Sequence, residues 1–152
     1  MLFKITTRRE ARECSLQMLY MLDICYQLSI NDIYHNIMRG YLINDKPYKK
    51  FSIFLFKGVC DNIKKIDYMI KCHVKNWEIQ RMAIVDRNII RIAIFEIFAT
   101  LDTPINVIID EAVEISKKYS TANSSKFVNG VLDNLKIIRK NKIYTNEKTK
   151  KN

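Results

Sequence analysis

Glycine and proline are scarce in this sequence: only 3 of its 152 residues are Gly and 2 are Pro. So few residues suited to tight turns disfavour folds built from many short strands. The sequence also lacks the glycine-rich patterns GxGxxG and GxxxxGK[ST], with which many nucleotide-binding proteins hold phosphates. The composition therefore argues against these nucleotide sites and against a many-stranded architecture.

Cysteine and histidine occur, but not in the patterns of a metal site or a disulfide framework. Cys14, Cys25, Cys60 and Cys72 show no CxxC spacing, and the sequence contains only two histidines. Cys72 and His73 are adjacent, so on a helix they would point to different faces. We therefore expect reduced thiols, mostly in the core, and no metal site.

Long apolar runs are also missing. No segment approaches the length that a bilayer requires, and the N-terminus lacks the apolar region of a signal peptide. A hydrophobic content of 48% with 28% charged residues is ordinary for a folded domain of this size. We expect a soluble, cytoplasmic protein with one domain at residues 1–139 and a disordered basic tail at residues 140–152.

Positive charge is abundant, with a formal net charge of +10. Residues 136–152 contain seven Lys or Arg against one Glu, and residues 4–12 contain four against one. Two basic ends favour nucleic acid or another polyanion as a partner. The alternatives are a solubilising tail and compositional drift, because the sequence is also rich in Ile, Lys and Asn.

Apolar residues recur every three or four positions along most of the chain, which predicts helices. Thr7 and Glu10 fit a capping box that starts a helix at the arginines. The segment VDRNIIRIAIFEIFATL is apolar over most of a helical surface and is expected at the centre of a bundle. Thr103 and Pro104 are typical of the N-cap and first residue of the next helix. The pattern predicts an all-α bundle of six or seven helices.

The first candidate site is the cluster Arg8, Arg9 and Arg12 in the opening helix. Cations at a helix N-terminus are slightly unfavourable, so stability alone would prefer acidic residues there. Arginines beside free backbone N–H groups suit phosphate, because the guanidinium donates two parallel hydrogen bonds. The alternative is a set of solvated side chains.

The second candidate site is the segment SKKYSTANSSKFVNG. Lys117, Lys118 and Lys126 flank a polar loop, and Phe127 follows it. Lysines can hold the backbone of single-stranded nucleic acid while an aromatic ring stacks on a base. The alternative for Phe127 is a core aromatic. Gly130 is expected to mark a close approach of two helices, since Gly inside a helix costs about 1 kcal/mol relative to Ala.

Catalytic patterns are weak. Asp110, Glu111 and Glu114 form an acidic patch on one predicted helix, but no nucleophile or metal ligand accompanies them in sequence. Such residues are more often a solvated helix face. No Ser-His or Cys-His arrangement can be nominated either.

Four motifs together resemble the NusB transcription antitermination factors: RREARECSLQMLYMLDI, VDRNIIRIAIFEI, TPINVIIDEAVEISKKYS and SSKFVNGVLDNL. They stand in the order and spacing of that family and cover the chain from Arg8 to about Leu135. The resemblance implies an all-helical fold of two packed subdomains, no catalytic activity and no cofactor. It also implies binding to the boxA element of nascent ribosomal RNA transcripts. The implied partners are the ribosomal protein NusE, other Nus factors and RNA polymerase, and some members form homodimers that hide the RNA surface.

The resemblance also assigns roles to individual residues. The arginine-rich motif of the family falls on the opening cluster, and an aromatic next to the RNA surface falls on Phe127. Tyr20 and Asp86 match positions associated with NusE or complex formation. The predicted RNA-binding residues are Arg8, Arg9, Arg12, Lys117, Lys118, Lys126, Phe127 and Asn129.

The sequence departs from the family pattern in three places, and two other functions compete. Glu10 replaces a basic residue of some relatives, Asn123 replaces a common acidic residue, and the basic tail exceeds the family core. Some ribosomal RNA methyltransferases carry a NusB-like domain, but they also need a catalytic domain with a glycine-rich cofactor loop. The other rival is a structural protein-interaction module with non-specific RNA affinity, which a weak salt dependence of RNA binding would reveal.

Overall fold

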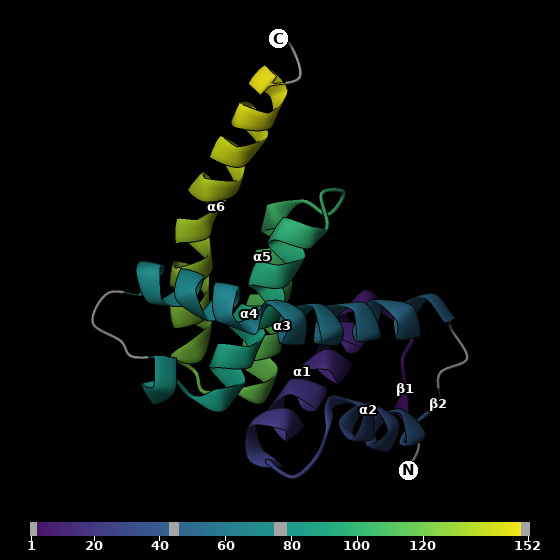
Figure 1. Ribbon diagram of the computed structural model, residues 1–152. Helices are drawn as coiled ribbons and strands as arrows, with labels where there is room; N and C mark the ends of the chain where they lie inside the picture. Colours follow the sequence, from purple (N-terminus) through teal and green to yellow (C-terminus); the bar gives the residue numbers. More distant parts are fainter. Residues whose placement is uncertain (1–2, 43–45, 75–78, 150–152) are drawn as a thin grey trace.

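The computed structural model describes residues 3–42, 46–74 and 79–149, and in these ranges the protein is a bundle of α-helices (Figure 1). The elements are β1 (Phe3–Lys4), α1 (Arg8–Ile24), α2 (Ile30–Arg39), β2 (Tyr41–Leu42), α3 (Lys46–His73), the 3-10 helix η1 (Ile79–Arg81), α4 (Ile84–Ala99), α5 (Ile105–Tyr119) and α6 (Ser124–Thr149). The predicted all-α class is confirmed. The two-residue strands form a parallel pair in which Phe3 aligns with Tyr41 and Lys4 with Leu42.

Helix α4 lies at the centre, as its apolar sequence predicted. It packs against α1, α3, α5 and α6 and lies in the middle of the bundle (Figure 1). Its fully buried side chains include Ile90, Ile94 and Ile97. The N-terminal group of helices α1–α3 and the C-terminal group α4–α6 thus share one continuous core through this helix.

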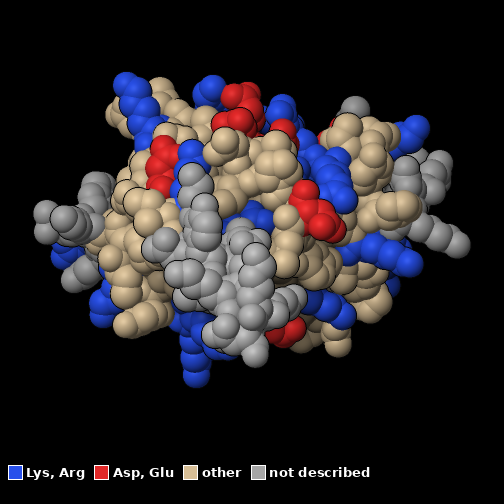
Figure 2. All heavy atoms as spheres, turned by 90° about the horizontal axis from the view of Figure 1, so that it is seen from above, with Lys and Arg blue, Asp and Glu red and all other residues tan. Residues whose placement is uncertain are grey.

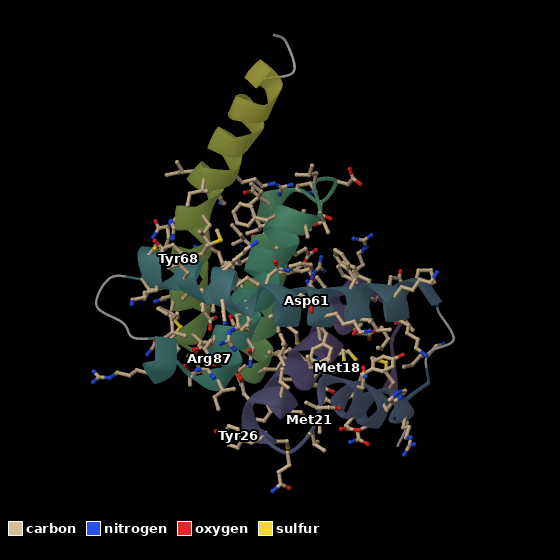
Figure 3. The ribbon with its side chains drawn as sticks, viewed as in Figure 1. Met18, Met21, Tyr26, Asp61, Tyr68 and Arg87 are labelled. Atoms are coloured by element: carbon tan, nitrogen blue, oxygen red, sulfur yellow. The ribbon has the colours of Figure 1, made fainter. Side chains whose placement is uncertain are left out.

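A polar network crosses that core where α1, α3 and α4 meet. Asp23 at the end of α1 accepts hydrogen bonds from Arg87 and Asn88 of α4, at 3.1 and 2.9 Å. Arg91 of α4 binds both carboxylate oxygens of Asp67 in α3 at 2.8 Å. Arg87 is labelled in Figure 3. Because each charge has an opposite partner, the network can be largely buried and still join the three helices.

The helix starts agree with the sequence at α1 and differ at α5. The side chain of Thr7 accepts a hydrogen bond from the backbone N–H of Glu10, and the Glu10 carboxylate accepts one from the backbone N–H of Thr7, so the predicted capping box is confirmed. In α5 the N-cap is Pro104 and the helix begins at Ile105, one residue later than predicted. The reason is that Pro104 has an extended ψ of 138°, which leaves it outside the helix.

Helix α6 extends well past the other helices at the C-terminal end (Figure 1). The helix continues through residues 140–149, where the sequence predicted a disordered tail. The division of the chain at residue 139 stays a prediction. None of the helices in the described ranges combines the length and the apolar composition of a membrane-crossing segment.

The prediction that Gly130 marks a close approach of two helices is wrong. A Cβ built on Gly130 would have no neighbouring atom within 4 Å, so no helix packs closely there. The close approach is at Gly58 in α3, where a Cβ would lie only 1.9 Å from Cζ of the Phe95 ring in α4. Gly58 therefore makes room for the aromatic ring of the central helix.

Candidate nucleic-acid interface

The first turns of α1 and the length of α5 form an open groove that gathers much of the predicted binding charge. We call it the arginine groove, and its charged lining includes Arg8, Arg9, Arg12, Glu13, Glu111 and Lys118. The capping box at Thr7 fixes where α1 starts and so presents its arginines to α5. The structure thus brings together two sets of cations that lie about a hundred residues apart in the sequence.

Arg9 spans the groove to α5. Its Nε and one terminal nitrogen donate hydrogen bonds to the two carboxylate oxygens of Glu111, at 2.9 and 2.8 Å. The Arg9 side chain is 47% exposed, and that of Glu111 is 19% exposed. The hydrogen bond from Arg9 lowers the pKa of the Glu111 carboxyl below its usual value and raises the pKa of Arg9. Both the Arg9 guanidinium and the Glu111 carboxylate are therefore charged at neutral pH.

Arg12 lies deeper than the other two arginines, with only 5% of its side chain exposed. It binds both oxygens of the fully buried Glu96 of α4, at 2.8 and 2.5 Å, and lies 3.5 Å from Glu111. Its guanidinium also lies over the ring of Phe51 at 5.3 Å. This placement favours a role in holding α1 in position. Direct contact of Arg12 with RNA, which the sequence predicted, stays a prediction.

Arg8 is exposed at the edge of the groove. Its guanidinium lies 4.7 Å from the centre of the Phe51 ring, on α3. An aromatic face attracts a cation without using its N–H groups as hydrogen-bond donors to an oxygen. Arg8 can therefore keep this contact and still donate to a phosphate.

The two lysines of α5 are both exposed and both paired with acids. Lys118 donates to Glu13 of α1 at 2.8 Å, and the Tyr119 hydroxyl donates to the same oxygen at 2.9 Å. Lys117 pairs with Glu114 of its own helix at 2.8 Å. The hydrogen bond to Glu13 raises the pKa of Lys118, so this ammonium stays charged at neutral pH. The Lys117 pair is exposed on both sides and can be exchanged for others, whereas Lys118 pairs with a carboxylate that is only 10% exposed.

Lys126, Phe127 and Asn129 lie elsewhere, on the first turns of α6. Lys126 and Phe127 line an open groove between α6 and the end of α3, which we call the α3–α6 groove, together with His73, Val74, Gly130, Val131 and Asn134. Its lining shares no residue with the arginine groove and contains no Asp or Glu. Phe127 is half-buried and packs partly against the core. The alternative interpretation of Phe127 as a core aromatic is therefore partly correct. Asn129 donates a hydrogen bond to Asp133 at 3.0 Å.

The two residues assigned to partner binding have different environments. Tyr20 is 39% exposed and lines an apolar pocket formed mainly by Leu16, Met21, Ile37 and Val85. Figure 3 labels Met21 of this pocket. Such a pocket beside an exposed tyrosine is suited to a protein partner.

Asp86, next in sequence to Val85, is 7% exposed and accepts a hydrogen bond from Ser124 at 2.8 Å. That hydroxyl also contacts those of Ser120 and Thr121, so Asp86 ties the start of α6 and the preceding loop to α4. Its other carboxylate oxygen is buried without a partner among the described residues. Direct contact of Asp86 with a partner stays a prediction.

Sequence reasoning assigned no binding role to Glu13, Glu96 and Glu111, yet all three contact the predicted binding cations. Glu111 was interpreted as part of a solvated helix face, but it points towards α1. A signal for Glu96 existed: it is the one charged residue in the otherwise apolar second half of α4, from Ile92 to Ala99, where a buried carboxylate needs a cationic partner. Nothing local in the sequence identifies which arginine that partner is.

The charge of the surface is mixed. Figure 2 shows the molecule from the end towards which α6 extends, with Lys and Arg around the whole described outline and acidic groups between them. Within the described residues no group of three or more His, Cys, Asp or Glu side chains is placed to hold a metal ion. All four cysteines are free thiols. Cys14 is buried in the core and Cys60 packs against it partly buried, whereas Cys72 is exposed.

A family model and similar proteins of known sequence point to one family. The model of the NusB family matches residues 9–136. The chain is 42% identical over 129 residues to the transcription antitermination protein NusB of Chloroherpeton thalassium, covering 85% of this chain but only 61% of that protein's length. It is 40% identical to the NusB protein of Bacillus licheniformis, covering 85% of this chain and 95% of that one.

Solved structures give the same result. A structure of T. maritima NusB matches with a TM-score of 0.78 and 36% identity, over 86% of this chain and 90% of that one. A crystal structure of the antitermination factors NusB and NusE in complex with double-stranded RNA matches with a TM-score of 0.77 and 25% identity. That match covers 84% of this chain and 94% of that one.

Proposed function

Because this chain belongs to the NusB family, we propose that it is a non-enzymatic, RNA-binding transcription antitermination factor. It binds the boxA element of nascent ribosomal RNA transcripts together with NusE, and so supports processive transcription of ribosomal RNA operons by RNA polymerase with other Nus factors. This activity would take place in the cytoplasm. The observation that carries the proposal is the arginine groove, in which cations of α1 and α5 meet on one concave surface.

In this proposal the arginine groove holds the RNA backbone. Arg8 and Arg9 are exposed and carry planar guanidinium groups, which match the geometry of phosphate. Lys118 adds a third charge on the opposite side of the groove. Contacts to phosphate fix the position of RNA but do not read its sequence.

Recognition of bases would then take place in the α3–α6 groove. Phe127 offers part of its ring, and Lys126 and His73 supply polar groups beside it without a competing carboxylate. Unpaired bases of RNA stack on such rings and form hydrogen bonds along their edges. Two separate grooves suit a single-stranded segment that runs across the protein.

NusE would occupy the apolar pocket at Tyr20. The pocket lies between α1, α2 and α4, and Tyr119 of α5 closes one side of it. Asp86 would support this surface indirectly, because it fixes the loop before α6 next to Val85. The solved NusB relative with NusE and RNA supports the choice of partner.

The proposal can be tested by fluorescence anisotropy with a labelled boxA RNA and a scrambled RNA, each with and without NusE. We expect tighter binding to boxA, and a further gain when NusE is added. Arg9→Gln should weaken binding to both RNAs, because it removes a phosphate contact. Lys64→Gln is the matched control, since Lys64 is an exposed cation on α3 outside both grooves.

The salt dependence distinguishes this function from a structural module with non-specific RNA affinity. That alternative has some support in the acids that pair with Arg9, Lys117 and Lys118. Binding through about four to six phosphates gives a log–log slope of roughly −3 to −4 for single-stranded RNA. Equal affinity for boxA and scrambled RNA, with no response to NusE, would refute the proposed function.

A further inference from the structure

We propose that Glu111 is an intramolecular competitor of RNA for Arg9, so that the free protein binds RNA more weakly than its arginines alone would allow. The inference rests on the proposed function, because it assumes that Arg9 meets RNA phosphate. It assigns a role in binding to an acidic residue, where the sequence indicated only a solvated face. Glu111 thereby becomes a determinant of RNA affinity that does not itself touch RNA.

The contact between the two side chains is of the kind that phosphate would make. The Glu111 carboxylate accepts two parallel hydrogen bonds from Arg9, from Nε and from a terminal nitrogen. Carboxylate and phosphate both bind the guanidinium in this forked geometry. One edge of the group cannot bind both anions at once, so a phosphate that takes this edge must displace Glu111.

The displaced carboxylate would not be left without a cation. One oxygen of Glu111 already lies 3.5 Å from Arg12, whose guanidinium is held by the buried Glu96. Arg12 is therefore fixed in place and keeps Glu111 beside the groove when Arg9 turns to RNA. This arrangement makes the exchange reversible and keeps the competitor close to its target.

The surrounding charges keep the competition active at neutral pH. Glu13 and Glu114 lie close enough to Arg9 to act on its charge, and Arg12 acts on Glu111. The hydrogen bond from Arg9 holds the pKa of Glu111 below its usual value. Glu111 is therefore ionised throughout the neutral range, and the competition does not switch with pH there.

The experiment compares Glu111→Gln with Asp110→Asn in the intact protein. Both substitutions remove one negative charge from α5, but Asp110 is exposed and does not line the arginine groove. The probes are the labelled boxA RNA and its scrambled control. We expect Glu111→Gln to tighten RNA binding about two- to fivefold. The gain should be the same for both RNAs, because phosphate contacts carry no base identity. Asp110→Asn should change the affinity by less than about twofold.

Salt dependence provides a second measurement. In the unaltered protein, a phosphate that binds Arg9 leaves the Glu111 carboxylate with only Arg12, whose charge Glu96 already neutralises, so Glu111 attracts salt cations in turn. In Glu111→Gln no carboxylate takes up cations, so the release of counterions from RNA is no longer partly cancelled. The log–log slope of Glu111→Gln should therefore be steeper than that of the unaltered protein by up to about 0.7, the value for one phosphate on a single strand.

A double variant tests whether Glu111 acts through Arg9. In the Arg9→Gln background, Glu111→Gln should give no gain beyond that of Asp110→Asn. Thermal unfolding of each variant supplies the structural control, because a surface ion pair contributes little to stability. We expect both single variants at α5 to unfold near the temperature of the unaltered protein.

The outcomes separate this inference from the proposed function. A gain for Glu111→Gln that exceeds Asp110→Asn and depends on Arg9 supports the inference. Equal effects of the two variants, or weaker binding by Glu111→Gln, overturn it, while a preference of the unaltered protein for boxA would leave the proposed function standing. If the unaltered protein binds neither RNA, the proposed function fails and the inference fails with it.

Discussion

The guanidinium of Arg12 in α1 and the carboxylate of Glu96 in α4 form a buried ion pair with two hydrogen bonds, of 2.8 and 2.5 Å. The side chains are 5% and 0% exposed. The pair joins the first turns of α1 to the central helix. It therefore fixes the direction in which Arg8 and Arg9 project, and the arginine groove depends on it whether or not Arg12 meets RNA.

Glu96→Ala should strongly destabilise the protein. Removal of one partner leaves the charge of Arg12 buried without compensation, which typically costs about 3–5 kcal/mol. Urea unfolding measures the change in the free energy of unfolding. The other carboxylate near Arg12 is that of Glu111, at 3.5 Å. Both of its oxygens already accept hydrogen bonds from Arg9, so Glu111 cannot replace the lost pair.

Two further variants make this prediction specific. The double substitution Arg12→Met with Glu96→Leu should recover most of the lost stability, because it removes both buried charges. Glu114→Ala breaks an exposed pair within α5 and should change stability by less than about 1 kcal/mol. A loss below about 1 kcal/mol for Glu96→Ala itself would mean that the pair is not needed for folding.

The sequence predicted those features that depend on neighbouring residues. The capping box at Thr7 and Glu10 involves residues three apart, and the central position of α4 follows from its own apolar composition. Ion pairs between helices were not predictable in this way. Arg12 and Glu96 are 84 residues apart, and Arg9 and Glu111 are 102 apart, so the packing of the helices decides which charges meet.

The same reasoning explains the failure at Gly130. A glycine inside a helix indicates that a side chain is unfavourable there, but not whether the obstacle belongs to the protein or to something that binds it. At Gly58 the obstacle is the ring of Phe95, and at Gly130 the protein itself supplies none. Only the three-dimensional packing distinguishes the two cases.

The four cysteines should differ in their rate of alkylation. Burial raises the pKa of the Cys14 thiol to about 11, so little of the reactive thiolate exists at pH 8. Cys72 is exposed at the end of α3. We expect iodoacetamide at pH 8 to modify Cys72 first and Cys14 only after denaturation, with the sites identified by mass spectrometry. Modification of both residues at one rate in the native protein would contradict the buried position of Cys14.

Gly58→Ala should destabilise the protein. The new Cβ would lie 1.9 Å from the Phe95 ring, which itself packs on Phe54 with ring centres 5.1 Å apart. Forcing an extra methyl into packed side chains typically costs about 1–3 kcal/mol, which offsets or exceeds the gain in helix propensity. Urea unfolding measures the result. Phe95→Leu should lessen the penalty of Gly58→Ala, and strictly additive effects would argue against the clash as its cause.

Gly130→Ala should act in the opposite direction on stability. The position lies inside α6 and is exposed, and the added methyl meets no atom of the protein within 4 Å. Replacing Gly by Ala in a helix interior stabilises it by up to about 1 kcal/mol. For a protein of this size the midpoint of thermal unfolding should rise by roughly 2–4 °C per kcal/mol, measured by circular dichroism.

If the α3–α6 groove receives an RNA base, Gly130→Ala should weaken RNA binding even as it stabilises the fold. The methyl would project into the groove beside Phe127 and Lys126, where a ligand would need the space. Asn36→Ala on α2 is the control, because it replaces an exposed helical residue that is not part of that lining. A stabilised Gly130→Ala protein that binds boxA RNA as tightly as before would mean that RNA does not approach α6 at this point, and base contacts would have to be sought elsewhere.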